Sequence, residues 1–207
     1  MAIDEILDEH EQSRRVQEWL RRNGAGLVGG VLLGLAAVGG WKWWQQREAQ
    51  ARMGEADTFQ AVVEAVERDG AKAAPRVAAL PAGTYRSLAA LRLAKAQVDA
   101  KDSAAAIATL QGAMPQDPAL RSVVEQRIAR LQIDTGKAAD ALKTLTGTDG
   151  PTLDLRGDAQ FALGQLDAAR ESYRKALAAT EVGSPQRRLI ELKYTQVGGV
   201  PAQPQTP

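Results

Sequence analysis

The sequence predicts an all-α protein, with one transmembrane helix near the N-terminus followed by a solenoid of helix pairs. A long uncharged stretch lies early in the chain, strand patterns are missing after it, and small and aromatic residues recur there at fixed spacing. Ala, Leu, Arg and Gln, which favour helices, are frequent in this later part. Short breaks with Gly and Pro separate segments long enough to form a helix or a helix pair.

The composition limits the functions open to the chain. Its 207 residues include 26 basic and 25 acidic side chains, so the net charge gives no reason to expect nucleic-acid binding. Cysteine is absent, and the single histidine, His10, lies near the N-terminus. Ser-His and Cys-His catalytic systems therefore cannot be built in the later part of the chain. We expect no enzymatic activity, no cofactor and no metal site.

Residues 23–41 form the uncharged stretch, with the sequence NGAGLVGGVLLGLAAVGGW. As a helix, these 19 residues span about 28 Å, close to the ~30 Å hydrocarbon core of a lipid bilayer. Indole rings prefer the headgroup level, and every tryptophan of the chain lies at an edge of the stretch. These membrane-interface residues are Trp19, Trp41, Trp43 and Trp44. We predict a transmembrane anchor over residues 23–44.

The flanks of the stretch bear on its processing and orientation. Ala37-Val38-Gly39 is a small-x-small sequence, so a cleaved signal peptide is the alternative to a retained anchor. The preceding region is longer and more acidic than a signal peptide requires, which favours retention. Arginines are enriched before the stretch, which favours a cytoplasmic N-terminus. We therefore predict a cytoplasmic tail over residues 1–22.

Three glycines repeat at four-residue spacing within the anchor: Gly26, Gly30 and Gly34. On a helix they form one smooth stripe, along which a second transmembrane backbone can approach closely. The stripe predicts helix–helix packing in the membrane. The alternative is that small residues are simply common in membrane helices.

A repeat pattern organises the later part of the chain. Gly164, Ala169 and Tyr173 have the spacing of the second half of a tetratricopeptide repeat, in which a turn, a close helix crossing and an aromatic filler follow one another. Gly157 takes the small position on the first helix. Two earlier units show the same offsets through Ala94 and Ala106, and through Ala129, Gly136 and Ala141.

These offsets predict a solenoid of about three degenerate repeats, near residues 85–118, 119–150 and 151–182. The alanines on the second helices of the three units, Ala106, Ala141 and Ala169, are 35 and 28 residues apart, against an ideal of about 34. A helical lead-in at 45–80 and a cap at 186–196 complete a domain over residues 45–196, and residues 197–207 are predicted to be a disordered tail. Stacked helix pairs bury a continuous core and leave exposed faces for protein binding.

Few polar residues of this domain suggest chemistry. Asp154 and Asp158 form a carboxylate pair that could in principle do acid–base work, but solvated helix-surface acids are the preferred interpretation. For Arg156, a structural ion pair is preferred over a ligand contact. No glycine-rich phosphate loop occurs.

The ordered combination of anchor, spacing and repeats resembles the YfgM family, the tetratricopeptide-like ancillary subunits of the bacterial SecYEG translocon. The likeness covers residues from about 15 to 195. It is carried by Asn23-Gly24, Gly40-Trp41-Lys42-Trp43-Trp44, Leu93-Ala94, Ala129-Arg130, Ala141-Leu142-Lys143-Thr144-Leu145, Asp154-Leu155-Arg156-Gly157, Gly164 and Ala169-Arg170.

The resemblance implies a single-pass protein of the bacterial inner membrane, with its N-terminus in the cytoplasm and its repeats in the periplasm. It implies association with SecYEG and with a PpiD-like membrane-anchored periplasmic chaperone. The implied function is a non-enzymatic scaffold that aids transfer of secreted client proteins to periplasmic chaperones. The alternative is an envelope-assembly or stress-signalling adaptor that uses the same tetratricopeptide-like surface.

Overall fold

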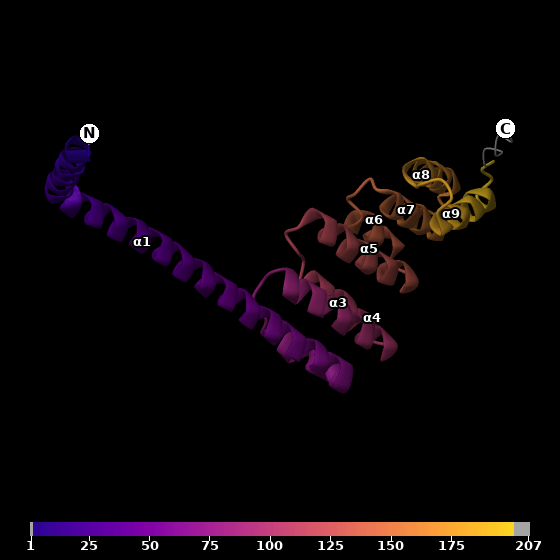
Figure 1. Ribbon diagram of the computed structural model, residues 1–207. Helices are drawn as coiled ribbons and strands as arrows, with labels where there is room; N and C mark the ends of the chain where they lie inside the picture. Colours follow the sequence, from indigo (N-terminus) through magenta and orange to yellow (C-terminus); the bar gives the residue numbers. More distant parts are fainter. Residues whose placement is uncertain (1, 201–207) are drawn as a thin grey trace. The chain divides into compact units, whose positions relative to one another are not determined.

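The computed structural model describes residues 2–200, except the side chains of residues 2–13, 49, 51 and 52. All regular structure in this range is helical, which confirms the all-α fold class (Figure 1). The chain divides into two compact units, Met1–Glu55 and Ala56–Pro207. They are described separately below.

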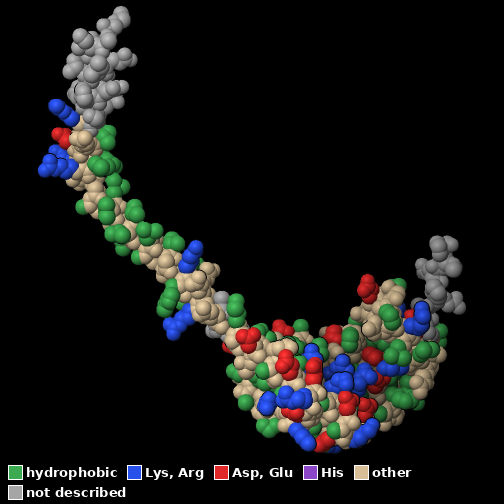
Figure 2. Space-filling model, turned by 60° about the horizontal axis from the view of Figure 1, so that its bottom comes forward, with side chains coloured by type: hydrophobic (Ala, Val, Ile, Leu, Met, Phe, Trp, Pro, Cys, Tyr) green, Lys and Arg blue, Asp and Glu red, His purple; other side chains and the backbone are tan. Residues whose placement is uncertain are grey.

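The first unit consists of the N-terminal part of one long helix, α1 (Ala2–Asp69). Its apolar stretch is long and apolar enough to cross a membrane, and none of the side chains in that stretch is buried inside the protein. Hydrophobic side chains line this part of α1 in Figure 2. A helix whose apolar side chains are exposed along such a length suits a lipid environment, because lipid can cover them all round.

The second unit contains the end of α1 and all later elements. Three helix pairs follow one another, as the repeat spacing predicts, with flanking helices on either side (Figure 1). The flanking elements before the pairs are η1 (Gly70–Ala73) and α2 (Ala74–Ala78). The pairs are α3 (Thr84–Asp99) with α4 (Ser103–Gln111), α5 (Pro118–Asp134) with α6 (Ala138–Thr144), and α7 (Gly150–Ala162) with α8 (Leu166–Ala179); α9 (Pro185–Gln196) ends the array.

Side-chain caps mark the starts of several helices. Asp102, Asp117 and Asp149 each accept a hydrogen bond from a backbone N–H of the first turn that follows, at 2.8–3.0 Å. Each bond satisfies one of the donors that a helix start leaves without a partner. A proline in the first turn of α5, α7 and α9 adds a backbone already fixed near the helical φ.

Within each pair the two helices are joined by the same tight turn. Lys101, Gly136 and Gly164 occupy its left-handed position, with φ of 66°, 75° and 73°. In the second pair, Gly136 N donates to Ile133 O at 3.0 Å and Lys137 N to Gln132 O at 2.7 Å, the two bonds of a Schellman motif. The first pair has the same bonds around Lys101, so a lysine there occupies a conformation that favours glycine.

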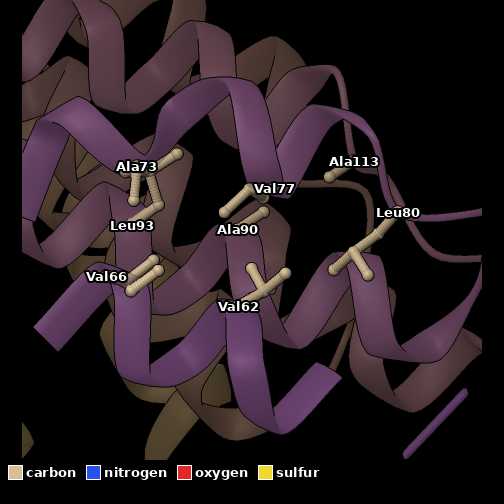
Figure 3. Packing of buried hydrophobic residues seen from close by; sticks show 10 residues of the cluster. Val62, Val66, Ala73, Val77, Leu80, Ala90, Leu93 and Ala113 are labelled. Atoms are coloured by element: carbon tan, nitrogen blue, oxygen red, sulfur yellow. The ribbon is translucent and has the colours of Figure 1, made fainter. Parts of the chain in front are cut away.

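The hydrophobic core begins at the end of α1. Val62 and Val66 of α1 pack with Val77 of α2 and with Ala90 and Leu93 of α3 (Figure 3). Further clusters link α3, α4 and α5, then α5, α6 and α7, and then α7, α8 and α9. The core is therefore a chain of small clusters between neighbours, as expected for a repeat array.

The C-terminal end of the described chain packs against α8. Val197 is buried, and its carbonyl oxygen accepts a hydrogen bond of 2.9 Å from Arg170 Nε. Val197 is the first residue of the tail predicted for residues 197–207. Residues 201–207 lie outside the described part of the chain.

Candidate functional site: the apolar helix and the repeat domain

The glycine stripe of α1 is exposed within its unit. A β-carbon built at Gly26, Gly30 or Gly34 meets no heavy atom within 4 Å, apart from the helix's own neighbouring backbone. The stripe therefore has room for a partner helix at close range. Its use in helix–helix packing stays a prediction.

The tryptophans at the edges of the apolar stretch are also exposed. The rings of Trp41 and Trp44 lie 5.6 Å apart, and the guanidinium of Arg47 lies 5.4 Å from the centroid of the Trp43 ring. Trp19 lies before the stretch, where its carbonyl accepts a hydrogen bond from the side chain of Asn23. An amphipathic ring beside a cation suits the headgroup region of a membrane. The role of these residues as interface anchors stays a prediction.

The small residues singled out by the repeat pattern lie where the two helices of each pair cross. Five alanines are buried, each at most 4% exposed. A larger side chain at such a position would push the helices apart. These alanines are Ala94 on α3, Ala106 on α4, Ala129 on α5, Ala141 on α6 and Ala169 on α8.

In the third pair a glycine lies very close to an aromatic ring of the neighbouring helix. A β-carbon built at Gly157 on α7 would overlap the ring of Tyr173 on α8. The Tyr173 hydroxyl donates a hydrogen bond of 2.8 Å to Asp158 Oδ1, which fixes the ring in this position. The structure therefore brings together two residues that the repeat pattern selects.

A repeated polar pair between the two helices was missed from the sequence. The Ser172 hydroxyl donates to Gln160 Oε1 at 2.6 Å, and the Thr144 hydroxyl donates to Gln132 Oε1 at 2.9 Å. Both pairs lie three residues beyond the small residues of their helices. Gln97 holds the same place on α3, where its buried Oε1 has no hydrogen-bond partner among the described residues. The recurrence of glutamine at the alanine spacing was the available signal.

A charged cluster ties α9 to α7, and sequence reasoning missed it. Lys193 Nζ lies 2.9 Å from Asp154 Oδ1 and 2.8 Å from Asp158 Oδ2, with all three side chains at most 22% exposed. The interpretation of these acids as solvated surface charges is therefore wrong, because α9 covers them. Burial raises the pKa of Asp154, and the hydrogen bonds from Lys193 oppose that rise. Burial, followed by the charge of Asp158, raises the pKa of Tyr173.

Arginines hold the ends of α6 and α8 and the loops that follow them. Arg156 donates to the backbone oxygens of Leu145 and Gly147, at 2.8 and 3.2 Å, so the preferred ion-pair interpretation is wrong. Arg187 bonds in the same way to the oxygens of Leu177 and Thr180. A planar guanidinium has several donors and can satisfy carbonyl groups that a helix end leaves free.

The described residues hold no group of three or more His, Cys, Asp or Glu side chains that could bind a metal ion. Their polar side chains instead connect helices and loops, as the cluster at Lys193 and the glutamine pairs do. The arrangement defines a helical-repeat protein with an exposed apolar helix before the repeats. Other molecules can contact this protein through its exposed helix surfaces.

The chain belongs to the tetratricopeptide repeat-like domain family, which matches residues 17–199. Two relatives confirm the resemblance to the YfgM family. The chain is 34% identical over 107 residues to the ancillary SecYEG translocon subunit of Escherichia coli strain K12. It is 28% identical over 181 residues to the ancillary SecYEG translocon subunit of Haemophilus influenzae.

The two alignments differ in extent. The first covers 50% of this chain and 52% of the E. coli protein, so it spans about half of that relative. The second covers 82% of this chain and 89% of the H. influenzae protein. No solved structure matches the chain.

Proposed function

We propose that the protein is a non-enzymatic scaffold of the bacterial inner membrane that associates with the SecYEG translocon. The observation that carries the proposal is the likeness to two proteins named ancillary SecYEG translocon subunits. The exposed apolar helix supports membrane anchoring, and the repeat domain supports binding to other proteins.

The proposed arrangement follows the chain. Residues 1–22 lie in the cytoplasm, residues 23–44 cross the membrane, and residues 45–196 lie in the periplasm. The arginines before the apolar stretch support this orientation. The glycine stripe packs against a membrane partner, and the repeats bind a PpiD-like chaperone and help to transfer secreted clients to periplasmic chaperones.

The test is purification of the tagged full-length protein from bacterial membranes in mild detergent, with mass spectrometry of the proteins that accompany it. A matched variant replaces residues 23–44 with an unrelated transmembrane helix of the same length, so the repeats stay at the membrane. Enrichment of translocon subunits with the native protein and their loss from the variant support association through the anchor. If translocon subunits are enriched with both the native protein and the variant, the contact lies in the repeats rather than in the anchor.

Two further outcomes decide the rest of the proposal. Co-purification of a PpiD-like chaperone supports the proposed transfer role. Recovery of envelope-assembly or signalling proteins without any translocon subunit contradicts the translocon proposal and favours the adaptor alternative. A reporter fused before residue 2 or after residue 200 tests the orientation, because its activity shows on which side of the membrane each end lies.

A further inference from the structure

The last helix of the array, α9, has no second helix of its own in the part of the chain that the structure describes (Figure 1). The helices α3, α5 and α7 each pack against the second helix of their pair. Helix α9 instead packs against α8 alone, through the buried side chain of Ile190 and the partly buried ring of Tyr194. The side of α9 that turns away from these residues is exposed.

This exposed side carries apolar residues. Among the exposed large hydrophobic residues described in the second unit, the four most exposed lie on α9 or just beyond its two ends. Leu189 and Leu192 on the helix are 53% and 66% exposed, and Val182 and Val200 flank it. The end of a repeat array is ordinarily polar because it must face water, so these leucines indicate a contact surface.

The repeat register shows that this side is not built for an ordinary second helix. Ile190 packs on α8 as Leu155, 35 residues earlier, packs on α6. The same offset places Leu192 at the position of Gly157, where α8 approaches α7 closely. A leucine side chain prevents such a close approach, so a helix that covers this side of α9 must pack at a wider separation.

The exposed residues of α9 follow the spacing of a two-helix coiled coil. Pro185, Leu189, Leu192 and Gln196 are separated by four, three and four residues, and all four are exposed. Residues at this spacing line one side of a helix, and they pack between the side chains of a second helix that lies nearly along the first. We call these four residues the α9 stripe.

We propose that the α9 stripe pairs with the α9 stripe of a second copy of the protein, with the two helices antiparallel. The stripe is self-complementary about the point midway between its two leucines. Leu189 of one copy then faces Leu192 of the other, and Pro185 faces Gln196. A two-fold interface requires this property, because the same patch serves both copies.

The charges beside the α9 stripe favour the antiparallel orientation. Arg188 and Lys193 flank the leucines on opposite sides and lie five residues apart. In a parallel coiled coil, residues with this relationship meet across the interface, so Arg188 of each copy would face Lys193 of the other and be repelled. In an antiparallel pair, Arg188 faces Thr195 and Lys193 faces Gln186, which removes the repulsion. Opposed helix dipoles favour the same orientation.

Membrane anchoring strengthens this pairing. A helix of 12 residues presents less area than a stable interface between separate proteins needs, which is about 1,200–2,000 Å² in total. Two copies anchored in one membrane meet at a higher effective concentration, which raises the paired fraction without any new contact. The pairing therefore rests on the membrane anchoring in the proposed function, and it does not require the translocon.

The experiment joins two copies by a disulfide in lipid vesicles. The chain contains no cysteine, so an introduced thiol can form a disulfide only with a thiol introduced into another copy. Full-length Leu189→Cys and Leu192→Cys proteins with different tags are reconstituted together and oxidised. The matched control combines Leu189→Cys with Ala178→Cys, which places the second thiol at an exposed position of α8.

We expect the mixed disulfide between positions 189 and 192 to form about fivefold or more above the control, because a disulfide requires Cα atoms about 4.4–6.8 Å apart. It should also exceed the disulfides that join position 189 to 189 and position 192 to 192, which a parallel pair would favour. A mixed disulfide no more abundant than the control, or a predominance of same-position disulfides, would overturn the proposal.

Two further measurements separate this pairing from the proposed function. Circular dichroism shows whether each variant is folded, and flotation of the vesicles shows whether it is anchored. If the protein does not float, the proposed anchoring fails and the pairing fails with it; if it floats and no mixed disulfide forms, only the pairing fails. If Leu192→Glu removes a co-purified partner protein and no disulfide joins two copies, that partner covers the α9 stripe and the proposal is wrong.

Discussion

The ring of Tyr173 on α8 packs directly on the backbone of Gly157 on α7, and it leaves no space for a β-carbon there. A β-carbon at residue 157 would lie 2.6 Å from Tyr173 Cδ1, well inside van der Waals contact. The hydrogen bond from the Tyr173 hydroxyl to Asp158 prevents the ring from moving aside easily. The close crossing of α7 and α8 therefore depends on a missing side chain.

Gly157→Ala should destabilise the repeat domain by about 1–3 kcal/mol, because the added methyl group forces the ring or the helix to shift. Alanine normally stabilises a helix relative to glycine, so steric overlap must outweigh that gain. Thermal unfolding of the full-length protein measures the effect. Gly54→Ala is the control, since a β-carbon at Gly54 meets open space. A variant at position 157 as stable as the native protein would contradict the crossing seen here.

Ala169→Arg should disrupt the third repeat. Ala169 is fully buried, and a long charged side chain has neither room nor an ionic partner at that crossing. The expected loss exceeds about 4 kcal/mol, enough to unfold the domain or abolish cooperative melting. Ala178→Arg, at an exposed position near the end of the same helix, should leave the melting temperature almost unchanged. Normal melting of Ala169→Arg would mean that the repeat register is wrong.

Lys101→Gly should stabilise the domain by up to about 1 kcal/mol. Lys101 has a φ of 66°, in the turn where the next two repeats have Gly136 and Gly164. Glycine adopts this conformation without the steric cost that a β-carbon imposes. Lys101→Ala keeps the β-carbon and serves as the control, with no expected gain. Chemical denaturation of the three proteins compares them, and a glycine variant less stable than the alanine variant would refute the prediction.

Lys193→Met should destabilise the attachment of α9, because two partly buried carboxylates lose their shared cation. We expect a loss of about 2–3 kcal/mol near pH 7, somewhat below the cost of breaking a fully buried pair. Lys175→Met, which removes an exposed cation, is the control. Faster hydrogen exchange confined to α9 would locate the effect.

The effect of Lys193→Met should depend on pH. Burial raises the pKa of Asp154, and loss of the opposing ammonium raises it further. A carboxyl with a raised folded-state pKa stabilises the fold below its unfolded value of about 3.9, and this contribution is lost as the pH rises through the folded pKa. The deficit of the variant relative to the native protein should therefore shrink between about pH 7 and pH 4. A deficit that grows on acidification would contradict this assignment.

Gly30→Leu with Gly34→Leu should weaken association with membrane partners and leave the repeat domain folded. Two large side chains would fill the smooth stripe along which a second helix can approach. Val31→Leu with Leu35→Val, a change outside the stripe that keeps the apolar volume, is the control. Comparison of co-purified membrane proteins measures the effect. Unchanged recovery from the glycine variant would exclude the stripe as an interface.

Local pattern in the sequence was enough to predict the fold class and the family. The length of the uncharged stretch at residues 23–41 can be read directly from the sequence and compared with the thickness of a membrane. A helix is the structure that satisfies the backbone hydrogen bonds of such a segment in lipid. The spacing of Gly164, Ala169 and Tyr173 lies within one helix–turn–helix unit, so the chain itself holds these residues near one another. For the same reason the turns at Gly136 and Gly164 could be located from sequence.

The tertiary structure decided which polar residues meet across the repeats. Lys193 and Asp154 are separated by 39 residues, and only the docking of α9 on α7 brings them together and buries them. A sequence shows which side chains carry a charge, and it therefore favours an acidic side chain as the partner of Arg156. It does not show that the backbone oxygens of Leu145 and Gly147 lie within reach. Periodicity along a helix is a local property, whereas burial and partner choice depend on which helices pack together.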